Sequence, residues 1–161
     1  NQTITNKDYL GSVYVLEFFF TTCPTICPKM NVNLGNIAKT FYDQKKFGIA
    51  SITINPEHDT TEVLKAYAEN LNYKKENWHF LTGDRDYIYK IANKGFNIYA
   101  AENKEALGGF EHSGLFALVD KKGMIRSRNL ENMNYPIVYY DGTTDEGVQM
   151  LKEDIQQLIK E

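Results

Sequence analysis

Hydrophobic and polar positions follow one another along this 161-residue chain in blocks that predict strands and helices in turn. The run Val13–Phe20 is almost continuously apolar and rich in β-branched and aromatic residues, which is typical of a strand buried on both faces. Phe47–Ile54 alternates like a second strand. Between these strands, apolar residues at helical spacing predict a helix over residues 27–42. Pro28 suits the first turn of that helix because an amide hydrogen there would have no partner.

The rest of the chain continues this alternation up to its end. The predicted elements are a helix from a cap at Asp59 or Thr60 to about Asn70, a strand at 78–81, a helix at 84–93 that stops near Gly95, a strand at 96–100, a hairpin that pairs 115–119 with 124–127, and a helix at 145–160. Strands alternate with helices early and a hairpin comes late, so we expect an α/β domain with a central mixed β-sheet flanked by helices. No linker or repeat interrupts residues 1–161, which predicts a single domain.

Charge and apolar content exclude two classes of partner for the visible chain. The net charge is −3 and no Lys/Arg cluster stands out, whereas a nucleic-acid surface normally leaves a basic stripe. The longest apolar runs are strand-sized, far below the roughly 18 residues that cross a bilayer. The chain begins abruptly, with polar residues and no signal peptide. We therefore expect a soluble fragment whose anchor or export signal lies upstream.

The two cysteines, Cys23 and Cys27, lie in a loop between the first strand and the first helix. Cys27 falls at the helix start, where free amides and the macrodipole stabilise a thiolate. With three residues between them, the two sulfurs can meet in a redox dithiol or splay around one ion. Thiolates favour Cu(I) and also zinc. A pair of inert buried thiols is the alternative, but the flanking Pro24 and Pro28 at a strand–helix junction favour chemistry.

His112 is the candidate third ligand among three histidines. It lies in the glycine-rich stretch Gly108–Gly114, which leads directly into the strand at 115–119 and whose glycines would let the loop deliver a ligand. In thioredoxin-type folds the corresponding loop carries a proline that shields the cysteine pair. Here no proline occurs between Pro56 and Pro136, and a histidine stands near that place. The alternative is a solvent-exposed loop histidine.

Four other residues with suitable donor atoms have structural explanations. His58 stands in a turn before a helix and is a weaker ligand candidate, while His79 beside Trp78 is expected to be a surface or satisfied core residue. Met30 lies at core spacing on its helix, and Met124 follows a turn, so we interpret both as structural.

Several segments resemble the Sco/SenC family of copper proteins and span nearly the whole chain. They are Phe18–Pro28 (FFFTTCPTICP), Ile54–Thr60 (INPEHDT), Trp78–Gly83 (WHFLTG), His112–Ser113 followed by Phe116–Asp120 (FALVD), and Tyr140–Thr143 (YDGT). A CxxxCP loop paired with a distant histidine before a Phe-x-x-Val-Asp strand is more specific than a lone CxxxC. The chain departs from the family pattern at Thr25, where many members have an acidic residue, and at His58, which stands in place of the arginine of an Arg-Asp-Thr pattern. Asn55 likewise replaces the aspartate of an Asp-Pro pair.

The resemblance implies a thioredoxin-like fold and one copper ion, Cu(I) or Cu(II), held by Cys23, Cys27 and His112. It implies delivery of copper to the dinuclear centre of the copper-bearing subunit of cytochrome c oxidase. A thioredoxin-like reductant or another copper chaperone would be further partners. It also implies a periplasmic location at the extracytoplasmic face of the cytoplasmic membrane, with an N-terminal membrane anchor outside this chain.

Three functions remain open at this point. The first is a copper chaperone. The second is a thiol–disulfide oxidoreductase in which Cys23 and Cys27 are the catalytic redox dithiol that keeps the oxidase cysteines reduced. The third is a copper or redox sensor whose loop Tyr99–Gly114 changes its partner binding. A thioredoxin-type peroxidase fits less well, because that chemistry uses a single activated cysteine.

Overall fold

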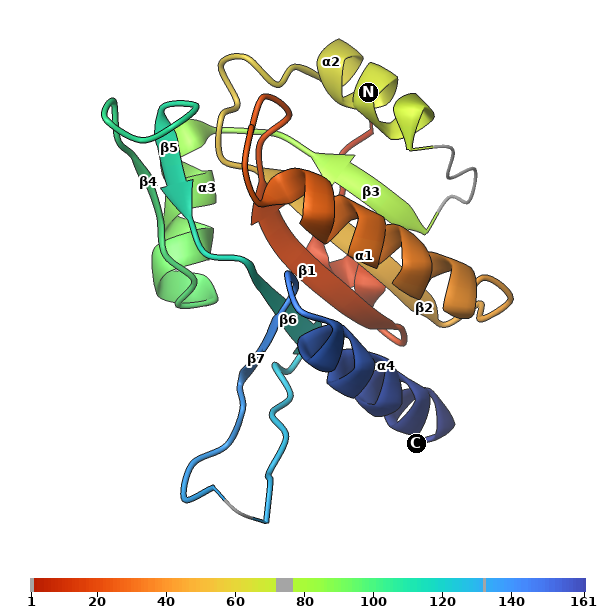
Figure 1. The fold of residues 1–161 in the computed structure, drawn as a ribbon. Helices are drawn as coiled ribbons and strands as arrows, with labels where there is room; N and C mark the ends of the chain where they lie inside the picture. The colour runs from red at the N-terminus through yellow and green to blue at the C-terminus, as the bar shows by residue number, and fades with distance from the viewer. Residues whose placement is uncertain (1, 72–76, 132) are drawn as a thin grey trace.

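The computed structural model describes residues 2–71, 77–131 and 133–161. In chain order its elements are a 3-10 turn (Asn6–Tyr9), β1 (Val13–Phe19), α1 (Cys27–Thr40), β2 (Phe47–Thr53), α2 (Thr61–Asn70), β3 (Trp78–Leu81), α3 (Arg85–Lys90), a π-helical turn (Ile91–Gly95), β4 (Ala100–Glu102), β5 (Phe110–His112), β6 (Leu115–Val119), β7 (Tyr139–Asp141) and α4 (Asp145–Lys160) (Figure 1). None of the helices in these three ranges combines the length and the apolarity that a membrane crossing requires.

A five-stranded mixed sheet forms the centre of the domain, with strand order β3-β2-β1-β6-β7. β1, β2 and β3 run parallel, because α1 and α2 provide the crossover connections that parallel strands need. β6 is antiparallel to both β1 and β7. The expected central mixed sheet is therefore confirmed.

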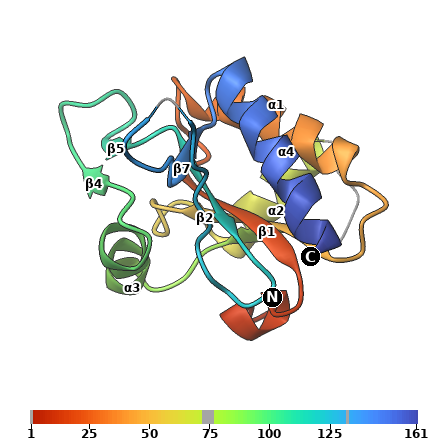
Figure 2. The same ribbon diagram turned by 90° about the horizontal axis from the view of Figure 1, so that it is seen from below.

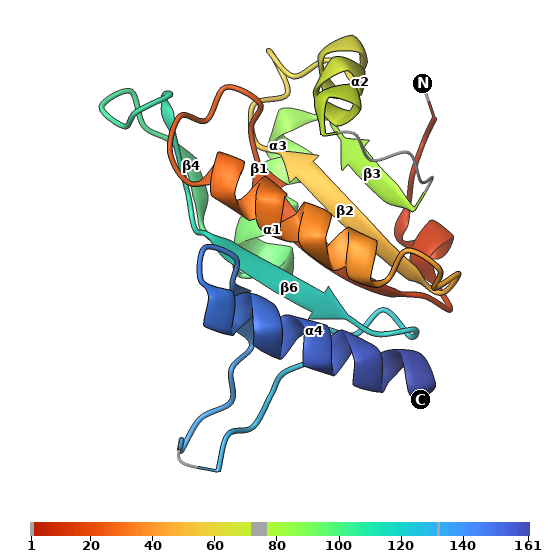
Figure 3. The same ribbon diagram turned by 45° about the vertical axis from the view of Figure 1, so that its right-hand side comes forward.

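Helices cover both faces of the sheet. α1 and α4 lie side by side over one face, and α3 lies on the other (Figures 2 and 3). Successive side chains of a strand point to opposite faces, so Val13 and Val15 join the core under α1 and α4. Tyr14 and Leu16 join the core on the α3 side. All seven residues of β1 are buried, which confirms the prediction of a strand covered on both faces.

The predicted helix starts are confirmed by their caps. Thr60 caps α2 by accepting a hydrogen bond from the Val63 amide at 3.4 Å, and Asp84 caps α3 by accepting one from the Tyr87 amide at 2.8 Å. A side-chain oxygen in this position satisfies an amide that has no partner within the helix. The predicted helix at 84–93 divides into α3 and the π-helical turn that follows it.

Two predictions in the second half of the chain need correction. The strand expected at 96–100 does not form, because Asn97 has a φ of 52° and the Ile98 amide hydrogen-bonds back to the Ala92 carbonyl at 2.9 Å. The strand β4 starts only at residue 100. In the expected hairpin, the segment after the turn makes a single β-bridge, between Val119 and Ile125, and does not form a strand.

Two strands were not predicted from the sequence. These are β5, which pairs with β4 in a separate two-stranded sheet, and β7, which pairs with β6. Each has only three residues, which is too short for a hydrophobic period to be visible.

Gly147 and Gly35 offer a matched test of helix packing. A Cβ on Gly147, in the first turn of α4, would lie 2.2 Å from the carbonyl oxygen of Asp141, whereas a Cβ on Gly35 in α1 meets nothing within 4 Å. We expect Gly147→Ala to lower the free energy of unfolding by about 2 kcal/mol. Gly35→Ala should raise it by about 0.5 kcal/mol through helix propensity. Urea denaturation measures both, and shifts of the same sign would contradict this packing argument.

Candidate metal and dithiol site

The cysteine loop leads from the end of β1 to the first residue of α1. Cys27 begins α1 and is 1% exposed, and Cys23 lies in the loop at 8%. The Cys23 amide donates a hydrogen bond to the Phe20 carbonyl at 3.2 Å, which closes the loop against the end of the strand. The two free cysteines therefore stand at the strand–helix junction that the sequence predicted.

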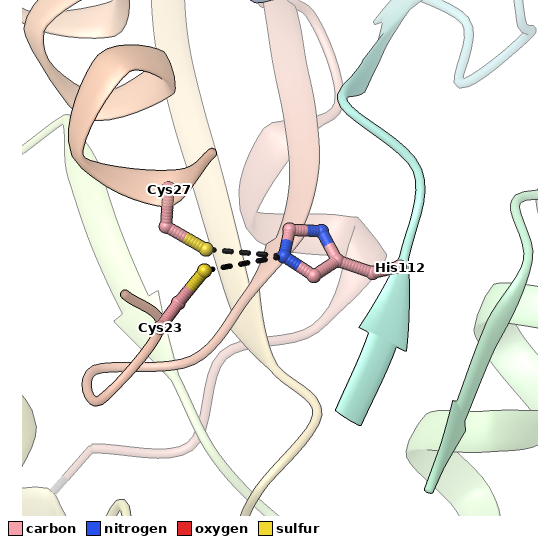
Figure 4. Close-up of side chains that lie close together, drawn as sticks. All are labelled: Cys23, Cys27 and His112. Carbon is pink, nitrogen blue, oxygen red and sulfur yellow. Dashed lines mark hydrogen bonds between the residues drawn. The ribbon is translucent and has the colours of Figure 1, made fainter. Parts of the chain in front are cut away.

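His112 reaches this junction from the end of β5. Its Nε2 atom lies 3.1 Å from Sγ of Cys27 and 3.9 Å from Sγ of Cys23 (Figure 4). One donor atom from each of the three residues lies within 4.8 Å of the other two. The structure thus brings together the three residues that the sequence proposed as ligands.

The imidazole of His112 is oriented by its other nitrogen and by an aromatic neighbour. Nδ1 lies 3.2 Å from the carbonyl oxygen of Ser113, so in the neutral ring Nδ1–H donates and the lone pair of Nε2 faces the sulfurs. The ring of Phe20 meets His112 edge to face, with centroids 5.7 Å apart. These contacts present Nε2 as a ligand atom.

Gly108 brings the β4–β5 loop close to the cysteine loop. Its φ is 87°, and a Cβ there would lie 2.9 Å from the ring of Phe20 and 3.0 Å from Pro24. The sequence suggested that this glycine gives the loop freedom to move. In the structure it allows a close approach between two loops.

The two cysteines share protons as a coupled pair. Hydrogen bonding with Cys27 is the main influence that lowers the pKa of Cys23 to about 3, with a further contribution from His112 and an opposing one from burial. The same hydrogen bond, followed by burial, raises the pKa of Cys27. The pair therefore gives up one proton readily and retains the second. A lowered thiol pKa favours the thiolate, the form that attacks disulfides and binds metals.

A pocket of about 350 Å³ opens beside Cys23 and His112. Its walls come from the cysteine loop and from the β4–β5 hairpin. The lining residues are Phe20, Cys23, Thr25, Ile26, Ala106, Leu107, Phe110, Glu111 and His112. A small ligand or a side chain of another protein can therefore approach Cys23 and His112 from this side.

The other histidines and methionines lie outside this group of three. Nδ1 of His58 is 2.8 Å from the Asp59 carboxylate, and Nδ1 of His79 is 2.6 Å from the Tyr9 hydroxyl, as expected for a satisfied residue. Met30 is fully buried in the core under α1, as predicted. Met124 is exposed and lies directly after the turn that follows β6.

Two buried carboxyl groups near the site were missed. Asp59 is fully buried. The sequence predicted a cap of α2 at Asp59 or Thr60, and in the structure the cap is Thr60. Glu17 is also fully buried, in β1. The signal for Glu17 was present, because it is the one charged residue in the apolar run Val13–Phe20. For Asp59 the signal was its place in the family-like segment Ile54–Thr60, but the sequence pattern indicated only a possible helix cap.

The fold and the site define a thioredoxin-like α/β protein with a dithiol and an imidazole at the end of its first strand. A sequence model of the SCO1/SenC family matches residues 1–139, and the chain belongs to this family. It is 30% identical over 135 residues to the SCO1 protein homolog of Bacillus subtilis, covering 81% of this chain and 69% of that protein. It is 35% identical over 129 residues to the SCO2-like protein RP587 of Rickettsia prowazekii, covering 76% of this chain and 61% of that protein.

Solved structures share the fold. A SCO1/SenC family lipoprotein from Bacillus anthracis superposes with a TM-score of 0.79 at 26% identity, covering 95% of this chain and 84% of that one. BsSco, described as a member of the Sco family of cytochrome c oxidase assembly proteins with a disulfide switch, gives 0.77 at 24% identity, covering 99% and 86%. Yeast Sco1 with copper bound gives 0.68 at 26% identity, covering 95% and 81%. These likenesses confirm the expected thioredoxin-like fold.

Proposed function

We propose that this protein is a copper chaperone that binds one copper ion through Cys23, Cys27 and His112. The observation that carries the proposal is the convergence of two sulfurs and one imidazole nitrogen within 4.8 Å of one another. Two thiolates are soft ligands that favour Cu(I), and an imidazole also suits Cu(II). The donor set therefore fits copper in either oxidation state.

The proposed site suits a cargo that must be handed on. Three protein ligands leave copper open to a further donor, and the pocket beside Cys23 and His112 gives such a donor a path. Copper can then pass to an acceptor by exchange of ligands. The proposed acceptor is the copper-bearing subunit of cytochrome c oxidase. Support comes from BsSco, which is described as belonging to a family of oxidase assembly proteins, and from yeast Sco1, which holds copper.

The proposal extends to domain organisation and location. We place residues 1–161 in a single domain that works at the extracytoplasmic face of the cytoplasmic membrane, tethered to it by a segment outside this chain. The Bacillus anthracis relative, which is described as a lipoprotein, supports tethering.

A thiol–disulfide oxidoreductase is the second candidate. The observation that favours it is the pair of free thiols Cys23 and Cys27 at the start of α1, where hydrogen bonding with Cys27 lowers the pKa of Cys23 to about 3. The Cys23 thiolate can attack a target disulfide, forming a mixed disulfide and expelling one target thiolate. Cys27 then attacks the Cys23 sulfur, which forms a Cys23–Cys27 disulfide and releases the second target thiolate. In this role the dithiol keeps the oxidase cysteines reduced and requires a thioredoxin-like reductant of its own.

Replacing His112 by alanine separates the two candidates. For a chaperone, we expect the wild type to bind one copper per chain, and His112→Ala to weaken Cu(II) binding about a hundredfold and Cu(I) binding less. Competition titrations with absorption and electron paramagnetic resonance spectra measure both. Disulfide exchange with a small-molecule disulfide should persist in the variant, because both thiols remain.

His79→Ala is the matched control, because it removes an imidazole that is hydrogen-bonded to Tyr9 and does not belong to the group formed by Cys23, Cys27 and His112. It should leave copper binding unchanged. A wild-type protein that exchanges disulfides but retains no copper would overturn the chaperone proposal in favour of the oxidoreductase.

A further inference from the structure

Asp59 lies behind the cysteine loop as a fully buried carboxylate that accepts four hydrogen bonds. Its Oδ2 accepts from the Thr21 amide at 3.0 Å and from the Thr53 hydroxyl at 2.5 Å. Its Oδ1 accepts from the Thr21 hydroxyl and from Nδ1 of His58 at 2.8 Å. A buried charge is tolerated only when it is paired and hydrogen-bonded in this way.

These hydrogen bonds join two loops that follow neighbouring parallel strands. Thr21 lies in the loop after β1, and Thr53 is the last residue of β2. The caps of α2 do not need Asp59, because Thr60 fills that role. The carboxylate therefore serves the connection between the loops rather than the start of a helix.

A single peptide group separates Asp59 from the backbone of Cys23. The peptide between Phe20 and Thr21 donates its N–H to Asp59 and accepts, through its carbonyl oxygen, the N–H of Cys23 at 3.2 Å. Fixing the plane of that peptide fixes the direction from which the Cys23 amide approaches. The position of the Cys23 sulfur relative to Cys27 and His112 depends on that direction.

We infer that Asp59 is a positioning residue for the copper site, which acts through Thr21 to hold Cys23 in the geometry that copper requires. The inference rests on the proposed function, since it assigns Asp59 to the same three ligands. Residues one shell behind metal ligands orient them, and their loss typically weakens metal binding by 10- to 100-fold. His58, whose side chain is half exposed, donates the second hydrogen bond to Oδ1 of Asp59.

Two valine variants distinguish positioning from general stabilisation. Thr21→Val replaces the hydroxyl, one of the two contacts that tie Asp59 to the cysteine loop, by a methyl group that pushes against the carboxylate held by the Thr21 amide. Thr53→Val removes the hydroxyl that ties Asp59 to β2 and leaves both contacts with Thr21. We expect Thr21→Val to weaken Cu(I) binding about tenfold and to shift the thiolate-to-Cu(II) absorption band. Thr53→Val should leave the band in place, and Thr21→Ser should restore wild-type binding. Urea denaturation of each variant reports stability separately.

Asp59→Asn adds a second test, because it keeps the shape of the side chain but replaces one acceptor by a donor that faces Thr21 or Thr53. If it folds, its absorption band should shift like that of Thr21→Val; if it does not fold, the valine pair decides. Wild-type affinity and spectrum in Thr21→Val, or equal losses in Thr21→Val and Thr53→Val, would overturn the positioning role. Failure of the wild type itself to bind copper would instead overturn the proposed function.

Discussion

Replacing either Cys23 or Cys27 by serine is expected to weaken Cu(I) binding by about a thousandfold. Structural zinc sites with four ligands bind with roughly 10–16 kcal/mol, so one ligand supplies about 2.5 to 4 kcal/mol, and the upper value corresponds to that factor. A serine hydroxyl is a hard donor that stays protonated at neutral pH and does not replace a thiolate. Competition with a chromophoric Cu(I) chelator at pH 7 measures the loss.

Thr22→Ala is the control for this experiment, because Thr22 is exposed in the same loop directly before Cys23. Its affinity should stay within a few-fold of the wild type. Unchanged Cu(I) affinity in the double variant Cys23→Ser, Cys27→Ser would show that copper binds elsewhere on the protein.

Glu17→Gln is expected to stabilise the protein at alkaline pH and to have little effect at acidic pH. Glu17 lies on the same face of β1 as Val13 and Val15 and is fully buried. Its Oε1 accepts a hydrogen bond from Ser51 at 2.6 Å, while among the residues that the structure describes its Oε2 has no partner. Burial raises the pKa of Glu17 to about 7, against the lowering effects of Ser51 and His112.

The sign of this effect follows from proton linkage. Between the ordinary pKa of 4.5 and the folded value of about 7, the folded protein holds a proton on Glu17 that the unfolded chain has lost. The wild type therefore loses stability as pH rises through this window, by about 3 kcal/mol in total at about 1.4 kcal/mol per pKa unit. Glutamine is neutral throughout and avoids this loss.

Urea unfolding of both proteins at pH 4.5, 6 and 8 tests this prediction. The stability difference should grow from near zero at the lowest pH to about 3 kcal/mol at the highest. Glu69→Gln, at an exposed position of α2, should change the unfolding free energy by less than about 0.5 kcal/mol at every pH. A stability difference for Glu17→Gln that is constant across this range would exclude a raised pKa.

The sequence by itself determined the cysteine loop and most of the elements around it. The placement of Cys27 at the start of α1 follows from local rules, since a continuous apolar run ends at Phe20 and Pro28 favours a first helical turn. Trp78–Leu81 and the capped starts of α2 and α3 also matched their predictions. Each of these features depends on neighbours within a few residues, which a sequence pattern records directly.

Only the tertiary structure decided how distant groups meet at the site. His112 stands 85 positions after Cys27, and its approach depends on the pairing of β4 with β5, two strands too short to show a period. The hydrogen bonds between Asp59 and Thr21 depend on the parallel pairing of β1 with β2. Burial and hydrogen-bond partners are set by what packs against a residue in space, and the order of amino acids along one strand or turn does not contain that information.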